Sequence, residues 1–199
     1  MHRRHLIALG LAACATPALA TASLAAPRTY RLGGKGATIT YTFMLSGAPV
    51  KGTVPVEGAD LLVDPENLAA STADVTADVR RARTGLIFAT EALKSPSVLD
   101  AAQFPLARFQ STRVVLGPGG RISNGASIEG RLTLRGVTRP VRFDANLYRQ
   151  PGSDANDLTT LIVALKGQVN RRDFGAMGYA DLVADTVDIA IDAEITAAR

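Results

Sequence analysis

The sequence predicts an all-β domain, an antiparallel barrel that is closed or nearly closed and carries one short helical insertion. Three observations support this fold class. Apolar and polar residues alternate over many short segments, turn-forming residues separate those segments, and a single helix-like stretch interrupts them. This pattern fits a barrel better than a doubly wound sheet. Because no linker, repeat or charge block divides the chain, we expect one domain over residues 27–199.

The two-residue period identifies the expected strands. Residues 38–45 alternate four apolar side chains with residues that are mostly threonine, and residues 187–195 alternate apolar side chains with carboxylates. The same period recurs at 75–79, 141–147 and 161–165. Each segment therefore reads as a half-buried strand with one face toward the core.

Turn signals stand between these strands, at 33–34, 46–49, 117–120, 124–125 and 150–157. The helical insertion is expected within residues 83–102, as two short helices broken at Ser95-Pro96. Ser97 and Asp100 have the spacing of an N-terminal cap for the second of them.

Residues 1–26 have the features of a cleavable signal peptide. A short basic start is followed by the apolar run 6–13, and small residues suited to cleavage stand at 18–20 and at 23–26. The run is shorter than the roughly 18 residues that a membrane-spanning helix needs. We therefore expect an exported protein that is soluble or peripheral, with no stable membrane insertion.

Two variants of export remain open. Arg3-Arg4 resembles a twin-arginine signal, which would carry a folded domain. Leu11-Ala12-Ala13-Cys14 resembles a lipobox, which would anchor the domain through lipid on Cys14. The small apolar residues that follow Cys14 are unlike a polar tether, so cleavage is the preferred interpretation.

Loss of the leader decides which chemistry remains. His2, His5 and Cys14 are the only histidines and the only cysteine of the chain, so residues 27–199 contain neither residue type. Nucleophilic Ser-His or Cys-His pairs, histidine or thiolate metal sites and disulfides are then excluded. Subtracting Arg3 and Arg4 from the formal charge of +4 leaves about +2, which is poor support for nucleic-acid binding. We expect no enzyme, no catalytic residues and no metal.

One acidic cluster carries enough carboxylates to be considered for calcium. It comprises Asp181, Asp185, Asp188, Asp192 and Glu194. Their spacing lacks the compact loop of an EF-hand, and the last three fall on the outer face of one strand, so a solvated face is expected.

Specific motifs add a family resemblance. Residues 130–141, GRLTLRGVTRPV, resemble the "G-x-L-T-[IL]-x-G-V-T-[KR]-P-V" signature of the YceI-like family of periplasmic proteins. Residues 91–111 are similar to its "L-x-S…[YF]-P-x-x-x-F-x-S" segment, and Arg172-Asp173-Phe174-Gly175 matches its late "[RK]-x-D-F-G" element. The closing segment 185–195 is similar to the family's last strand.

The resemblance implies an eight-stranded, lipocalin-like barrel that binds a long apolar ligand, a polyisoprenoid or similar lipid or quinone. Such a carrier needs no cofactor besides that lipid, and affinity would come from apolar area removed from water. The residues expected to contact the ligand are Ile39, Tyr41, Phe43, Leu45, Phe88, Leu93, Phe104, Phe109, Leu132, Leu134, Phe143, Leu147, Phe174, Ile189 and Ile191. In the late motif, Gly175 is expected to supply a special backbone conformation and Phe174 to plug the barrel.

This chain departs from the family pattern at the head-group region. Family members usually carry two histidines near the second strand, and the nearest positions here are Ala37 and Leu45-Ser46-Gly47. An aromatic motif of the family becomes Gly52-Thr53-Val54-Pro55-Val56-Glu57-Gly58. Any head-group contact made by those histidines is therefore missing, and the cavity can differ in shape.

Other functions remain open beside the carrier. The same alternation would build a side-chain-filled barrel that serves as a structural or interaction module without ligand, and a homodimer is compatible with the sequence. An outer-membrane barrel is disfavoured, since the chain has no tryptophan and no terminal aromatic residue. The residues 136–140 are expected to form a hairpin connection with Pro140 at a strand start.

Overall fold

The computed structural model describes residues 27–33, 37–118, 125–154 and 156–198. The expected signal peptide, with Cys14, lies outside the described residues, as do Gly34, Gly119-Gly120 and Asn124 of the expected turns. The strands are β1 (Arg28–Leu32), β2 (Thr38–Leu45), β3 (Ala48–Val63), β4 (Thr72–Asp78), β5 (Arg83–Thr84), β6 (Leu106–Val115), β7 (Ala126–Leu134), β8 (Val137–Arg149), β9 (Thr160–Asn170) and β10 (Val183–Ala197). The helices are α1 (Ile87–Lys94) and the 3-10 turns η1 (Leu68–Ala70), η2 (Val79–Arg81) and η5 (Arg171–Phe174).

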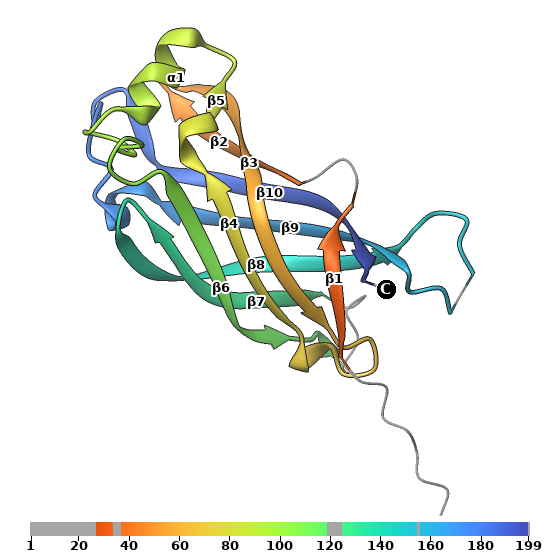
Figure 1. The fold of residues 1–199 in the computed structure, drawn as a ribbon. Helices are drawn as coiled ribbons and strands as arrows, with labels where there is room; N and C mark the ends of the chain where they lie inside the picture. Colours follow the sequence, from red (N-terminus) through yellow and green to blue (C-terminus); the bar gives the residue numbers. More distant parts are fainter. Residues whose placement is uncertain (1–26, 34–36, 119–124, 155, 199) are drawn as a thin grey trace, which may run out of the picture.

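Eight of these strands close an antiparallel barrel, in the order β10-β2-β3-β4-β6-β7-β8-β9, with β9 returning to β10 (Figure 1). Closure is made by β10, whose residues 187–192 pair with β2 on one side and with β9 on the other. The predicted fold class is thereby confirmed, with α1 lying over one end of the barrel.

The short strand β1 completes the wall at the end opposite α1. Its residues 30–32 pair with the end of β10, and its residues 28–30 pair with the end of β3. This is the part of β3 that β2 does not reach, because β2 pairs only with residues 48–55. Tyr30 of β1 is fully buried, and its hydroxyl donates a 2.6 Å hydrogen bond to the Leu158 carbonyl.

Two tight hairpins have the turn chemistry that their sequences predict. Ser46-Gly47 connects β2 to β3 with φ of 50° and 83°, and Arg135-Gly136 connects β7 to β8 with φ of 51° and 73°. Two successive positive φ values define the type I′ turn, whose twist matches that of the flanking strands. The hairpin at 135–136 confirms a connection here, but Pro140 lies within β8 opposite Arg131 rather than at a strand start.

Within residues 83–102 the structure has one α-helix rather than the two short helices expected. The α1 helix ends at Lys94, and residues 96–103 form a series of turns. The amide of Asp100 donates to the Ser95 carbonyl over 2.9 Å, and Asp100 itself has a φ of 48°. This left-handed backbone reverses the chain where a second helix was expected, so the predicted cap at Ser97 has no helix to begin.

Candidate functional site

The interior of the barrel is hollow and apolar. At the α1 end lies an upper chamber of about 840 Å³, and below it lies a lower chamber of about 210 Å³. The two share five lining residues, Ile39, Ala77, Ala107, Leu132 and Ile189, which we call the neck. The upper volume falls within the range typical of small-molecule sites. The two chambers thus adjoin inside the barrel, and we refer to them together as the lumen.

The upper chamber is built from strand walls and a loop cover. Inward residues of β2, β7, β9 and β10 form its wall, since alternate side chains of a strand point to the same face. The cover consists of α1, the turn that follows it, and the segment 176–183. Glu91 and Arg171 are the charged residues of this lining.

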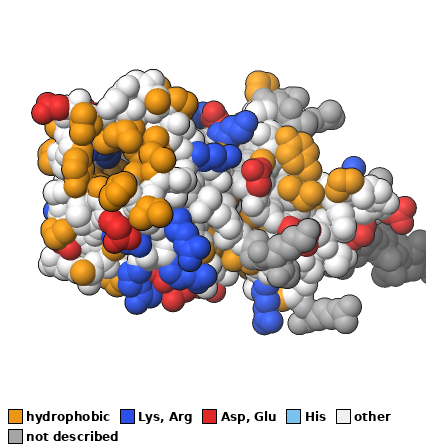
Figure 2. All heavy atoms as spheres, turned by 90° about the horizontal axis from the view of Figure 1, so that it is seen from above, with side chains coloured by type: hydrophobic (Ala, Val, Ile, Leu, Met, Phe, Trp, Pro, Cys, Tyr) orange, Lys and Arg blue, Asp and Glu red, His pale blue; other side chains and the backbone are white. Residues whose placement is uncertain are grey.

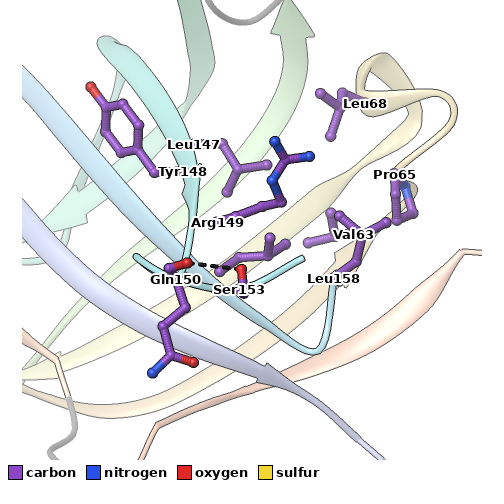
Figure 3. A pocket seen from close by; sticks show the side chains of 10 residues that line it. Val63, Pro65, Leu68, Leu147, Tyr148, Arg149, Gln150, Ser153 and Leu158 are labelled. Carbon is purple, nitrogen blue, oxygen red and sulfur yellow. Dashed lines mark hydrogen bonds between the residues drawn. The ribbon is translucent and has the colours of Figure 1, made fainter. Parts of the chain in front are cut away.

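The lower chamber ends on a buried cluster. Tyr30, Leu161 and Ile195 pack together there, each at most 2 % exposed. Beside this cluster lies a shallower depression of about 540 Å³, of mixed polarity, which shares Val63, Leu68 and Leu147 with the lower chamber (Figure 3). Its loop is held by the Ser153 hydroxyl, which donates to the Gln150 carbonyl over 2.8 Å. The buried cluster therefore packs against the wall of the lower chamber at this end.

Three aromatic rings lie against strand glycines. A Cβ added at Gly130 would come within 2.5 Å of the Phe109 ring, one at Gly167 within 2.6 Å of the Phe143 ring, and one at Gly52 would overlap the Tyr41 ring. Each ring occupies the space that a side chain would take on the neighbouring strand. We infer that these glycine–ring contacts hold the rings along the wall, which leaves room in the lumen.

The rings are further fixed by their own contacts. Phe109 and Phe143 meet edge to face with centroids 5.5 Å apart, and Tyr41 stacks beside Phe43 at 6.3 Å. The Tyr41 hydroxyl donates to the Arg83 carbonyl of β5 over 3.0 Å. Burial raises the pKa of the Tyr41 phenol well above its usual range, so this hydroxyl stays protonated.

Arg171 is a buried cation at the edge of the upper chamber. Its guanidinium donates to the carbonyls of Ala176 and Gly178, both at 2.7 Å, to Val183 at 3.0 Å and to Ala184 at 3.2 Å. Four of its five donors thus hold the segment 176–184 that covers the chamber. Sequence reasoning missed this residue, because a basic residue at a strand end resembles any solvated side chain.

In the late motif, Gly175 has the special backbone conformation that the sequence predicts, whereas Phe174, expected to plug the barrel, lines neither chamber. Gly175 has a φ of 73° and ends η5, and Phe174 is 1 % exposed. The Arg172 side chain binds the Asp185 carboxylate at 2.6 Å. Asp185 and Asp188 of the acidic cluster are engaged with Arg172 and Gln168, respectively. Over the described ranges, no group of three His, Cys, Asp or Glu side chains is placed to hold a metal ion.

Most residues expected to contact a ligand line the lumen. In the upper chamber these are Tyr41, Phe43, Leu45, Phe88, Leu93 and Leu134; in the lower chamber they are Phe109, Phe143, Leu147 and Ile191; Ile39, Leu132 and Ile189 belong to the neck. Phe104 and Phe174 line neither chamber. Phe104 packs on the 135–136 turn, where a Cβ at Gly136 would come within 2.7 Å of its ring, and Phe174 is buried within η5. Ligand contact by the other thirteen stays a prediction.

The prediction also omitted much of the lower wall. Ala37, Val56, Ala59, Leu61, Val75, Val163 and Leu165 line this chamber as well. Val75, Val163 and Leu165 lie in strands that the two-residue period identified, so the same signal could have found them.

None of the helices in the described part of the chain is long and apolar enough to cross a bilayer.

The fold and the motifs agree with known proteins. The sequence model of the YceI-like domain family matches residues 30–195. A "UPF0312 protein" of Vibrio vulnificus is 31% identical over 147 residues, which cover 72% of this chain and 73% of the relative. Burkholderia cenocepacia BcnA has a similar structure, with a TM-score of 0.68, 20% identity, and coverage of 79% of this chain and 95% of BcnA. A polyisoprenoid binding domain from Saccharophagus degradans superimposes with a TM-score of 0.62 at 11% identity, covering 86% of this chain and 99% of that domain. The chain therefore belongs to the YceI-like family.

Proposed function

We propose that this protein is a periplasmic carrier that sequesters a long apolar lipid, a polyisoprenoid or a quinone-like lipid, inside its barrel. The observation that carries the proposal is the apolar lumen, in which two chambers share the neck residues. The likeness to a polyisoprenoid binding domain supports the same ligand class. An open lumen also favours the carrier over a barrel with a side-chain-filled core.

The physics of such a ligand suits this wall. An isoprene unit of five carbons would gain about 4 kcal/mol from burial, at ~0.8 kcal/mol per carbon, before the costs of ordering the chain. Several units then provide ample affinity without polar contacts. A ligand of this kind needs binding and shielding rather than chemistry, so we propose a binding protein and not an enzyme.

Export is the remaining part of the proposal. The basic and apolar segments of residues 1–26 support a cleavable signal peptide, and the lipid anchor on Cys14 remains the less favoured form. N-terminal sequencing of protein isolated from the periplasm tests this, since a start near residue 27 is expected.

The ligand is tested by extraction and reloading. Protein isolated from its native periplasm is expected to release a long-chain lipid into organic solvent, and the delipidated protein should take up a polyprenol or a ubiquinone. Ala107→Phe should reduce uptake by filling the neck, whereas the matched Ala190→Phe on the outer face of β10 should not. Absence of lipid in native protein, together with no uptake by folded delipidated protein, would contradict the carrier.

A further inference from the structure

Large apolar side chains are exposed around the opening of the upper chamber. They are Leu86, Ile87, Phe88, Met177, Tyr179 and Leu182, which we call the mouth collar. Ile87 and Phe88, at the first turn of α1, are 81% and 91% exposed. Figure 2 shows hydrophobic side chains gathered around a hollow on the face seen from above. A contiguous apolar patch of this kind marks an interaction surface, whereas scattered exposed residues do not.

The collar is continuous with the interior. Leu86, Phe88, Tyr179 and Leu182 also line the upper chamber, so one apolar surface runs from the lumen wall to solvent. A lipid that passes through this opening would stay in contact with apolar side chains throughout. The collar therefore surrounds the exit that the proposed cargo would use.

The exposed tip is held in place by hydrogen bonds. The amide of Thr84 donates to the Thr90 hydroxyl over 2.9 Å, and the amide of Leu86 donates to the Thr84 hydroxyl over 3.1 Å. These bonds fix the chain on both sides of Ile87 and Phe88. The two side chains are thus presented to solvent by an ordered turn, so little backbone entropy is lost when they are buried.

Charge distinguishes the two ends of the barrel. The loops at the α1 end, residues 46–47, 79–105, 135–136 and 171–182, carry seven Lys and Arg and four Asp and Glu, a formal charge of +3 that Asp78 and Asp185, the partners of Arg80 and Arg172, reduce to +1. The described loops at the opposite end, 64–71 and 150–159 without residue 155, carry four Asp and Glu and no Lys or Arg. Arg81 and Arg83 are exposed beside the collar, so this end suits an anionic lipid surface better than the acidic opposite end does.

We propose that the mouth collar docks the barrel onto the surface of an anionic lipid bilayer, with Ile87 and Phe88 entering the interface and Arg81 and Arg83 facing lipid phosphates. The contact is peripheral, because the collar has no segment that could span the bilayer. The inference rests on the proposed lipid-binding function, since it gives the cargo a path between membrane and lumen that avoids water.

Vesicle flotation tests the docking. The full protein should bind vesicles of phosphatidylcholine and phosphatidylglycerol more strongly than vesicles of phosphatidylcholine alone, and salt should weaken the difference. Ile87→Ser with Phe88→Ser should lower the partition coefficient roughly tenfold or more. The matched control is Leu62→Ser with Tyr148→Ser, an aliphatic and an aromatic residue that are exposed away from the collar; it should bind like the parent protein.

A second pair of variants separates charge from apolar contact. Arg81→Gln with Arg83→Gln should abolish the preference for phosphatidylglycerol, whereas Arg131→Gln with Arg142→Gln on the outer barrel wall should keep it. No binding of the parent protein to either vesicle, or equal binding by all variants, would overturn the proposal. So would a dimer in sedimentation equilibrium that the collar variant dissociates, because the collar would then be covered by a second copy.

The docking and the carrier function fail in different ways. Vesicle binding is measured on delipidated protein, and lipid content is measured on native protein. A lipid-filled barrel that ignores vesicles would refute the docking alone, whereas a vesicle-binding barrel that never holds lipid would refute the carrier.

Discussion

The substitution Gly52→Ala tests whether the glycine–ring contacts keep the lumen open. Gly52 of β3 lies directly opposite Tyr41 of β2. A Cβ at this position would overlap the Tyr41 ring and would come within 2.5 Å of the Arg83 carbonyl. The ring must then leave the wall, and because Tyr41 lines the upper chamber, it is expected to enter the lumen.

The expected cost follows from two losses. The displaced ring gives up the 3.0 Å hydrogen bond from its hydroxyl to the Arg83 carbonyl, worth about 1 kcal/mol. Overpacking of the strand pair adds about 1–3 kcal/mol. The free energy of unfolding should therefore fall by about 2–4 kcal/mol, which lowers the melting temperature by roughly 4–16 °C for a domain of this size.

Urea titration and thermal melting measure this loss, and the same strand supplies the control. A Cβ at Gly58 of β3 meets nothing within 4 Å, so Gly58→Ala should be neutral or stabilising by up to about 1 kcal/mol. Uptake of a polyprenol should fall in the Gly52 variant alone. In a Tyr41→Ala background, Gly52→Ala should cost at least about 1 kcal/mol less than in the parent protein. Equal stability of the two alanine variants, or no coupling to Tyr41, refutes the reasoning.

Three further predictions concern the lumen, its cover and the outer wall. Phe43→Asp puts a carboxylate on the wall of the upper chamber and should reduce retained lipid roughly tenfold in extraction assays. Asp188→Ala on the outer face of β10 is the control and should leave retention unchanged. Equal retention by the two folded variants would remove Phe43 from the binding set. Arg171→Met leaves four carbonyls without their donor and should lower the free energy of unfolding, measured in urea, by about 2–4 kcal/mol. Arg172 is more exposed, so Arg172→Gln should cost less than about 1 kcal/mol. Comparable losses in the two variants would contradict the role of Arg171. The hydrogen bonds from Arg108 lower the pKa of Asp74, and those from Arg80 lower the pKa of Asp78, so both carboxylates stabilise the fold above the ordinary carboxyl pKa and lose this effect as the pH falls below about 4. The melting temperature should accordingly fall in acid, and Asp74→Asn should reduce that fall. An equal fall of the melting temperature in the Asp74→Asn variant and the parent protein would contradict the assignment to Asp74.

Uninterrupted alternation made some strands predictable from sequence and left others hidden. The strands β2 and β10 were found because apolar residues recur at every second position over most of their length. In β3 the register shifts between Val56 and Gly58, and in β6 it shifts between Ser111 and Arg113. Each bulge moves the apolar residues from one parity to the other, so neither segment shows a continuous two-residue period.

The candidate site was predictable where the side chains of the wall are large and apolar. Thirteen of the fifteen expected residues line the lumen, and for those in β2, β8 and β10 the inward-facing positions follow from the strand period. Phe88, Leu93, Phe109, Leu132 and Leu134 lie outside the strands that this period identified. The volume itself was not predictable, since small neck residues such as Ala77 and Ala107 have no distinctive pattern. The second helix was wrongly predicted for a related reason: the positive φ of Asp100 depends on contacts with the preceding turn rather than on local propensity.

Closure of the sheet by β10 has a kinetic consequence. A cargo cannot leave between two strands of the barrel without breaking the backbone hydrogen bonds that join them, so the wall offers no lateral exit. Exchange must then be governed by the ends of the barrel, and the upper chamber lies at the end covered by α1 and the segment 176–183. The residence time of the cargo in the barrel should therefore respond to changes in the segments 84–99 and 176–183 far more than to changes in the strands of the wall.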